Sequence, residues 1–505
     1  MKTKNSALLF ILGLGFFLRV LPLDQSYWLD ESINVRAVSS KGFIDLITQY
    51  SLGDFHPPLY HVFLRFWISF IGNNEVATRI LSVFFGVITI YFLYRISSLI
   101  FRRTEISFFG LKIPIQIIPS ILLATSGLHI YYSGESRMYS LAAMFTTIAM
   151  FYLLKIKAEA RFTTSFENLK NVAINTIKEL FKPDYWLATL RKSDSWFYIF
   201  ALYGALMTDY VPWLLLPLLI LLVPLETVVA LILTSAWWPF FYKQLQIGLG
   251  TAAEFPLWGQ VVGGFSLKNT ILIVIKFLIG RVSIDNNLLY FSVLLPPVII
   301  TLLLSLRALK NLSRKTKLIH YIPLMWLIVP ISVGIVLSTK VSLLSYFRFL
   351  FVLPAFYLVI TQGLRRMSKT TTYLVVIVLL ATQVISSGAY IFMPKFHRED
   401  WRGLAAWIDE TNSSSAISLI PNYAQADPYL YYQKKVPITD TFESIDQLPD
   451  TFYLIRYLQE IFDPEDHLRE RLEDLDYTLV EQKSFNGVVV WHYQRTDRLF
   501  AFQTE

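Results

Sequence analysis

About eleven long apolar runs, separated by short polar stretches, constrain this chain more than any other feature of its sequence. A helix needs roughly 20 mostly apolar residues to cross the hydrocarbon core of a bilayer. Inside lipid every backbone N–H and C=O must be paired within its own segment, so each run is expected to be a helix. The expected spans are residues 6–23, 77–101, 113–132, 138–156, 196–209, 211–225, 226–241, 288–306, 318–339, 343–362 and 371–393.

The composition also indicates an integral membrane protein. Of the 505 residues, 54% are hydrophobic and only 16% are charged, whereas a soluble domain has about 25% charged residues. The net charge of +8 comes from short basic clusters between the apolar runs, which is the pattern of membrane topology signals, so no nucleic-acid partner is expected. The chain has no cysteine, which excludes disulfides, thiolate metal sites and a thiol nucleophile.

The basic clusters predict the orientation in the membrane. With eleven spans they all fall on one side, which the positive-inside rule makes cytoplasmic. The first span lacks a small-residue cleavage site and is expected to be a retained anchor. The amino terminus is then cytoplasmic and the carboxy-terminal region extracytoplasmic, in a multi-pass protein of the plasma membrane. The clusters are Lys2 and Lys4, Arg102 and Arg103, Lys155 with Lys157 and Arg161, 307–317, and Arg365 with Arg366 and Lys369.

The sequence changes character at residue 395, which predicts two domains. Residues 395–505 contain 20 acidic and 11 basic residues, and helix-like and strand-like stretches alternate in them. Helices are expected at 401–410 and 465–474, and strands at 416–420, 452–457 and near Tyr477 and Val488. The expected organisation is an all-α transmembrane domain at 1–394, with outer loops at 24–75 and 242–287, followed by a small extracytoplasmic α/β domain.

Several chemically capable side chains are expected on the outer face of the membrane. An acid pair directly follows the first span, and charged residues at bilayer depth are costly and usually functional. An arginine lies inside the tenth expected span, and further acids, a histidine and tyrosines fall in outer loops. The residues are Asp30, Glu31, Asp54, His56, Tyr60, Glu135, Arg137, Tyr139 and Arg348.

This set of residues suits an enzyme whose substrate has a lipid tail and an anionic head. Arginine binds phosphate through a fork of donors, so Arg137 and Arg348 are candidates to hold a lipid phosphate. A carboxylate could accept the proton of an acceptor hydroxyl. Because phosphate is already a tolerable leaving group, one base suffices for sugar transfer from a lipid phosphate. Attack from the opposite face would invert the anomeric carbon, as in single-displacement glycosidases.

The motifs resemble those of the GT-C polytopic glycosyltransferases related to protein O-mannosyltransferases and the aminoarabinose transferase of lipid A. Each motif is short, but together they cover most of the chain and are densest in residues 16–141. The motifs are Arg19 with Trp28-Leu29-Asp30-Glu31, His56-Pro57-Pro58-Leu59-Tyr60, residues 79–86, residues 135–141, Arg348 to Pro354, and residues 400–407.

The resemblance implies a polyprenyl-phosphate-linked sugar donor and an active site on the non-cytoplasmic face. It implies Asp30 as the base or its activator. We expect Glu31 and His56 to support Asp30, and Asp54, His56, Tyr60, Glu135 and Tyr139 to contribute to substrate binding. Glu135 matches a position that ligates a divalent metal ion in some relatives, but no second acid pair accompanies it, so the metal is left open. The sequence names neither the sugar nor the acceptor, which could be a protein, a lipid or a polysaccharide.

Structural interpretations stand beside these functional ones. Asp30 and Glu31 could simply begin a helix, and Asp54 with His56 could form a turn before Pro57-Pro58. His61 is expected on a helix surface, and Arg36 and Arg79 are expected to be loop or snorkelling charges. The competing function is a transporter or flippase of lipid-linked sugars. Against it, the charges cluster on one face, and no inverted repeat is visible.

Overall fold

The computed structural model describes residues 2–101, 105–108, 111–159, 178, 182–254, 263–313, 316–411, 416–440 and 448–496. The chain forms two compact units. The membrane unit comprises Met1–Leu23, Gly42–Phe70 and Arg79–Phe392, and the α/β unit comprises Asp24–Lys41, Ile71–Thr78 and Met393–Glu505. The expected first outer loop, 24–75, therefore contributes to both units. Of the basic clusters that predict the orientation, Arg102, Arg103 and Arg161 lie outside the described residues.

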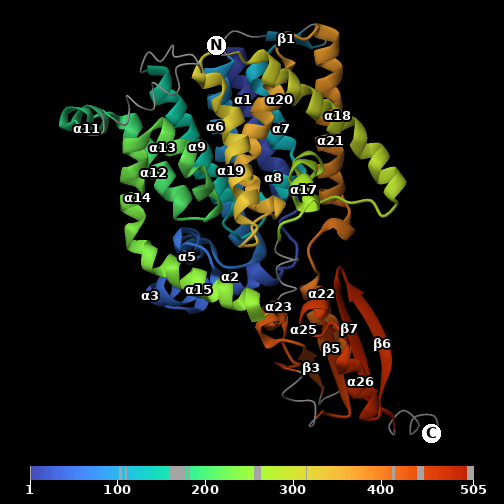
Figure 1. Cartoon of the computed structure of the whole chain (residues 1–505). Coiled ribbons are helices and arrows are strands. Elements are labelled where there is room, and N and C mark those ends of the chain that lie inside the picture. The colour runs from blue at the N-terminus through green and yellow to red at the C-terminus, as the bar shows by residue number, and fades with distance from the viewer. Residues whose placement is uncertain are drawn as a thin grey trace. The chain divides into compact units, whose positions relative to one another are not determined.

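The membrane unit is built from helices that follow the apolar runs of the sequence (Figure 1). Among the described residues, six helical stretches are long and apolar enough to span a bilayer, or seven if a bent pair counts as one span. The six are α6 (Glu75–Ile100), α9 (Tyr139–Glu159), α14 with η5 and α15 (Pro224–Thr234, Ser235–Trp237 and Trp238–Glu254), α18 (Asn287–Asn311), η7 with α20 (Tyr346–Val352 and Leu353–Leu364) and α21 (Lys369–Phe392). By length and composition these helices are those of a multi-pass membrane protein.

The bent pair joins η2 and α7 (Ile115–Ile117 and Ile118–Thr125) to α8 (Gly127–Ser133) at an angle of 56°. Shorter apolar helices fill most of the other expected spans. They are α1 (Lys2–Val20), α12 (Ser193–Leu206), η4 with α13 (Val211–Leu215 and Leu216–Leu222) and α19 (Ile322–Leu337). The remaining elements are α3 (Phe43–Asp45), η1 (Leu46–Tyr50), α4 (Ser51–Asp54), α5 (Leu59–Ile71), β1 (Glu105–Phe108), β2 (Leu111–Pro114), α11 (Pro183–Leu190), α17 (Leu267–Ile279) and η6 (Leu318–His320).

The expectation of eleven full spans is thus confirmed for six or seven of them. Proline is one physical reason for the difference, because it lacks an N–H and interrupts helical hydrogen bonding. Pro212, Pro217 and Pro224 divide the apolar stretch between 196 and 241 into short helices. An apolar run shows how many apolar residues follow one another, but it does not show whether they form one continuous helix.

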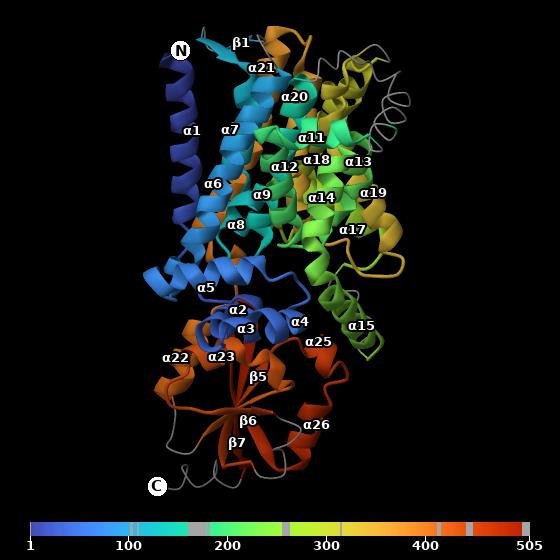
Figure 2. The same cartoon turned by 90° about the vertical axis from the view of Figure 1, so that its left-hand side faces the viewer.

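Helix α20 is the centre of the membrane unit. Each of its residues is buried, and it packs against α7, α18 and α19, as Figure 2 allows the reader to follow. A side chain at Gly363 would meet the carbonyl oxygen of Leu304 at 2.2 Å, so glycine permits this close approach of α20 and α18. Only 22% of the most apolar segment of α18 is buried, so most of this segment is available for contact with lipid.

The α/β unit contains a five-stranded sheet in the order β4-β3-β5-β7-β6. β3 pairs in parallel with β4 and β5, while β5 with β7 and β7 with β6 are antiparallel. The strands are β3 (Ile417–Ile420), β4 (Ile438–Asp440), β5 (Thr451–Arg456), β6 (Tyr477–Phe485) and β7 (Val488–Arg495). The helices are α2 (Leu29–Ser40), α22 (Trp401–Thr411), α23 (Asp427–Tyr432), α25 (Gln459–Phe462) and α26 (His467–Asp474), with two short 3₁₀ turns, η8 (Pro394–Phe396) and η9 (Tyr423–Gln425).

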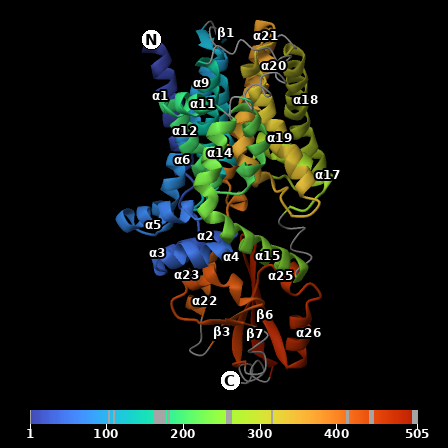
Figure 3. The same cartoon turned by 60° about the vertical axis from the view of Figure 1, so that its left-hand side comes forward.

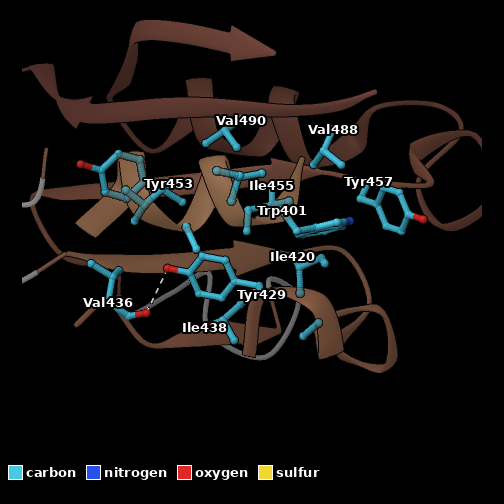
Figure 4. Close-up of a cluster of buried hydrophobic side chains, with 14 of the residues drawn as sticks. Trp401, Ile420, Tyr429, Val436, Ile438, Tyr453, Ile455, Tyr457, Val488 and Val490 are labelled. Atoms are coloured by element: carbon cyan, nitrogen blue, oxygen red, sulfur yellow. Dashed lines mark hydrogen bonds between the residues drawn. The ribbon is translucent and has the colours of Figure 1, made fainter. Parts of the chain in front are cut away.

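Two apolar clusters hold this sheet between helices. One centres on Trp401, Tyr429 and Ile455, and it includes Leu29 of α2 (Figure 4). The other, with Leu454 and Leu472, packs α26 on the opposite face. The helices expected at 401–410 and 465–474 are confirmed, as are the strands at 416–420 and 452–457 and the two near Tyr477 and Val488. The contribution of α2 was not expected.

Candidate functional site

The membrane unit gathers three basic side chains around the carboxylate of Asp54. Nη1 of Arg137 donates to Oδ1 over 2.8 Å. Oδ2 lies 3.0 Å from Nδ1 of His56 and 3.3 Å from Nε2 of His61. Asp54, His61 and Arg137 are buried, and His56 is half-buried. The structure thus brings together three of the predicted residues, and it adds His61, which was wrongly expected on a helix surface.

Local structure explains why these side chains meet. Asp54 ends α4, and Phe55 turns the chain in the left-handed conformation, with φ of 59°. Pro57 and Pro58 then lead into α5, whose first turn carries His61. Arg137 lies in the connection between α8 and α9. A carboxylate at a helix carboxy terminus opposes the helix dipole, so Asp54 depends on these neighbours for its stabilisation.

Asp54 is held in its ionised form. Its burial would by itself raise the pKa of the carboxyl, but the charge of Arg137 and the interactions with His56 and His61 outweigh this effect. The pKa of Asp54 therefore lies well below its usual value of 3.8. A permanently charged carboxylate orients the three basic side chains, and the arrangement can present donors to an anionic group.

Gln244 of α15 fixes the loop that carries Asp54 and His56. Its Nε2 donates to the carbonyl oxygen of Ser51 and, over 3.2 Å, to that of His56. Its Oε1 accepts from the hydroxyl of Tyr210, which in turn accepts from Nε1 of Trp237 at 2.8 Å. Figure 3 shows α15 continuing from α14. This network ties the loop to a membrane-spanning stretch.

The remaining predicted residues of the membrane unit are Tyr60, Glu135, Tyr139 and Arg348. Tyr60 is buried, and its hydroxyl lies 3.3 Å from that of Ser82. Glu135 is buried at 2% exposure, two residues before Arg137. Arg348 lies at the beginning of its span, where Nη1 donates to the carbonyl oxygen of Ser342 over 2.5 Å.

Tyr139 and Arg348 are connected through an aromatic group. The ring of Phe347, the residue before Arg348, contacts those of Tyr132 and Tyr139 at centroid distances of 5.7 and 5.3 Å. Helix η7, which carries Arg348, also packs against α9, which Tyr139 begins. These contacts place Arg348 beside the start of α9. Arg79 is not a snorkelling charge as expected, because it is buried and donates to the carbonyl oxygen of Leu23 over 2.7 Å.

Asp30 and Glu31 occupy the first turn of α2, in the α/β unit. Acidic residues there complement the helix dipole, as the structural interpretation expects. The two acids nevertheless differ in access, because Glu31 is fully buried whereas Asp30 is partly exposed. Of the pair, Asp30 is therefore the one able to reach a substrate. Its association with the Asp54 cluster stays a prediction.

Several contacts hold α2 within the α/β unit. Arg36, expected to be a loop charge, pairs with Asp427 at 2.9 Å. The guanidinium of Arg398 lies 4.0 Å from the ring centre of Trp28, and the backbone N–H of Tyr27 donates to the hydroxyl of Tyr432 over 2.8 Å. The acid pair is thus carried by a helix that the carboxy-terminal sequence supports.

A divalent metal ion does not fit the Asp54 cluster. One carboxylate oxygen already meets the positive guanidinium of Arg137 at 2.8 Å, and the other faces two imidazoles. A metal ion bound to Asp54 would be adjacent to that guanidinium charge, which disfavours its binding. Among the residues that the structure describes, no group of three or more acids and histidines is placed to hold a metal ion.

The comparisons with known proteins support the fold. No family model matches the chain, and no curated protein matches its sequence. The structure is similar to that of ArnT from Cupriavidus metallidurans in the apo state, with a TM-score of 0.54 and 11% identity, covering 97% of this chain and 98% of that chain. It is also similar to ArnT bound to undecaprenyl phosphate, with a TM-score of 0.51, 12% identity, and coverages of 96% and 97%. The fold is that of the GT-C glycosyltransferases.

Two residues of this site, His61 and Gln244, were not predicted by the sequence analysis. His61 is a single histidine in an apolar helix, and nothing in the local pattern separates it from a core residue. Gln244 lies 188 residues from His56 along the chain. Its neighbour in the network, Tyr210, lies 34 residues away along the chain, so no local pattern connects these residues.

Proposed function

We propose that this protein is an integral membrane glycosyltransferase that moves a sugar from a polyprenyl-phosphate donor to an extracytoplasmic acceptor hydroxyl or amine. The observation that carries the proposal is the fold likeness to ArnT, which extends over 97% of this chain and so includes sequence from both units. The same neighbour was solved with undecaprenyl phosphate bound, which supports a lipid-phosphate donor. The proposed location is the plasma membrane, with the amino terminus cytoplasmic.

The proposed phosphate ligands are Arg137 and Arg348. A guanidinium stays protonated and offers five N–H donors in a planar fork, which suits phosphate oxygens. Asp54 orients Arg137 through a hydrogen bond of 2.8 Å. His56 and His61 add two further possible donors to the same cluster. Tyr60, Glu135 and Tyr139 are proposed to shape the surroundings of the donor.

The proposed base is Asp30. It is the accessible member of the acid pair, while the buried Glu31 supports the helix turn from below. In the reaction, Asp30 accepts the proton of the acceptor hydroxyl, and the oxygen forms a bond to the anomeric carbon. The bond from that carbon to the phosphate oxygen breaks, and its electron pair leaves with polyprenyl phosphate. A single displacement of this kind inverts the anomeric carbon.

The test is release of polyprenyl phosphate by the purified protein in detergent from a panel of polyprenyl-phosphate hexoses and pentoses. Wild type is expected to act on one donor, which names the sugar. Asp30→Asn is expected to lower the rate at least about a hundredfold, within the range of a lost general base. Arg137→Ala is expected to weaken donor binding.

The matched control is Asp474→Asn, the same substitution at an exposed residue of α26, which should leave the rate unchanged. Failure of every donor, with envelope extract supplied as acceptor, would favour the transporter or flippase alternative, because a flippase has no turnover without two compartments. An unchanged rate in Asp30→Asn would remove Asp30 from the role of base.

A further inference from the structure

The α/β unit contains an open cavity of about 470 Å³ just beyond the carboxyl end of β5. Its wall begins with the last residue of that strand, Arg456, and continues through residues 457–460 to Gly487 and Trp491 on the β6–β7 side. β5 is parallel to β3, and ligands of open α/β sheets bind outside the carboxyl ends of parallel strands. The volume lies in the range of small-molecule sites.

Three residues of the cavity wall carry a buried polar atom without a hydrogen-bond partner. Among the residues that the structure describes, Oε2 of Glu399, Oε1 of Gln459 and Nε1 of Trp491 are buried and have no hydrogen-bond partner. Buried polar groups in native proteins are nearly always paired, so three in one wall indicate a polar ligand. Gln459 is fixed in place, because its Nε2 donates to Asp463 over 2.9 Å, which leaves its oxygen as the acceptor.

The charges of the wall disfavour an anionic ligand. The guanidinium of Arg456 is already paired with Asp466 at 2.6 Å and lies 3.8 Å from the ring centre of Trp491. Glu399 and Glu460 add two carboxylates to the wall. A phosphate would be repelled by this balance, whereas hydroxyl groups can donate to the carboxylates and to Gln459 and accept from the indole N–H.

Aromatic rings are a second feature of the wall that suits sugars, although Arg456 covers one face of the Trp491 indole. The negative face of an aromatic ring attracts polarised C–H groups, such as those of a pyranose ring. A second cavity of about 480 Å³ shares Gln482 and Trp491 with the first and is lined by Tyr477 and Tyr493. Because they share these residues, the two cavities are neighbours along β6 and β7, and together they are called the groove.

The cavity also adjoins the surroundings of Asp30. Tyr457 forms part of its wall, and Figure 4 shows the hydroxyl of Tyr457 directed away from the apolar cluster. Burial raises the pKa of Tyr457 well above its usual value, and the charges of Glu399 and Asp30 raise it further. The proposed base therefore lies within electrostatic range of a residue that lines the cavity.

We propose that this groove binds a saccharide portion of the acceptor. Its role as an acceptor site rests on the proposed transferase activity, but the binding of a saccharide does not. The acceptor would then be a hydroxyl-rich glycan or glycolipid, with its sugar held by Glu399, Gln459 and Trp491.

The experiment measures binding of neutral trisaccharides to the full chain in detergent, without donor, by saturation-transfer NMR and calorimetry. The probes are maltotriose, mannotriose and N-acetylchitotriose, with inorganic phosphate as the anionic probe. At least one trisaccharide is expected to bind with a Kd of about 1 mM or tighter. Gln482→Trp, which fills both cavities, is expected to weaken that binding at least about tenfold.

The control is Glu481→Trp, because neighbouring strand residues point to opposite faces and Glu481 lines neither cavity. It should keep wild-type affinity. The proposal is overturned if no trisaccharide binds, if Gln482→Trp binds like wild type, or if phosphate competes with the sugar. A melting temperature of Gln482→Trp close to that of wild type would show that this variant is folded. The binding assay needs no donor, so its result does not depend on the transferase test with Asp30→Asn. Either proposal can therefore fail while the other is supported.

Discussion

Arg137 and Asp54, 83 residues apart in the sequence, form a buried ion pair with 2.8 Å between Nη1 and Oδ1. The side chains are 5% and 7% exposed. Breaking a buried pair leaves one charge without compensation, which costs about 3–5 kcal/mol. Arg137→Met and Asp54→Asn are each expected to lower the thermal stability of the detergent-purified protein markedly.

The double variant separates pairing from general damage. If the two residues interact as a pair, Asp54→Asn with Arg137→Met should lose less stability than the sum of the single losses, because neither variant side chain is charged. If the loss in melting temperature of the double variant equals the sum of the two single losses, the pairing of Arg137 with Asp54 does not itself stabilise the protein.

The ionisation of Asp54 also predicts a pH dependence. The pKa of its carboxyl is lower in the folded protein than the usual 3.8, so the unfolded chain binds its proton first as the pH falls. The stabilisation from Asp54 is therefore fully present above about pH 5 and is lost as the pH falls below 4 toward the folded pKa. Melting temperatures measured from pH 3 to 7 should fall less steeply for Asp54→Asn than for wild type. An identical slope below pH 4 would contradict this assignment.

The sequence predicted those features that depend on local patterns. Apolar periodicity located the helices of the membrane unit and the main strands of the α/β unit, because burial selects residue types at regular spacing. It also placed Asp54, His56 and Arg137 on one expected face. The eleven complete spans that it predicted are confirmed for only six or seven, because breaks at prolines such as Pro217 and Pro224 depend on packing around the interrupted backbone.

Contacts between segments that are distant along the chain could not be predicted from the sequence. Nothing local to Arg36 indicates that it pairs with Asp427, which lies 391 residues away. The burial of Glu31, in contrast to the access of Asp30, likewise depends on the α/β unit around α2. An alternation of helix and strand predicted that unit, but it could not indicate that a segment of the first loop completes it.

The pair of Arg36 with Asp427 is expected to matter more for activity than for stability. Both side chains are about a third exposed, and such pairs contribute about 0–1 kcal/mol. Burial raises the pKa of Asp427 although Arg36 lowers it, which agrees with a small net gain. Because the pair holds the helix of the proposed base, Arg36→Asp should lower transfer about tenfold, as misplacement of a reacting group does.

The charge-swapped variant tests this role. Arg36→Asp combined with Asp427→Arg restores opposite charges at the same two positions and should recover most of the lost kcat. If Arg36→Asp affected only the stability of the fold, kcat measured well below the melting temperature would be unchanged in the single variant, and the swapped variant would have no loss to recover. No recovery in the swapped variant would indicate that the pair does not position α2.

Gln244 offers the sharpest test of how the Asp54 loop is held. Gln244→Glu keeps an oxygen for the hydroxyl of Tyr210 but loses the N–H donors to the carbonyl oxygens of Ser51 and His56. Leaving a buried acceptor without its donor costs about 1–3 kcal/mol, and here the loss falls on one loop. Hydrogen exchange in residues 46–58 should therefore accelerate in Gln244→Glu, with little change in α20. Gln246→Glu, at an exposed residue of the same helix α15, is the matched control and should exchange like wild type. Equal exchange in all three proteins would mean that the loop is held by Arg137 and Asp54 alone.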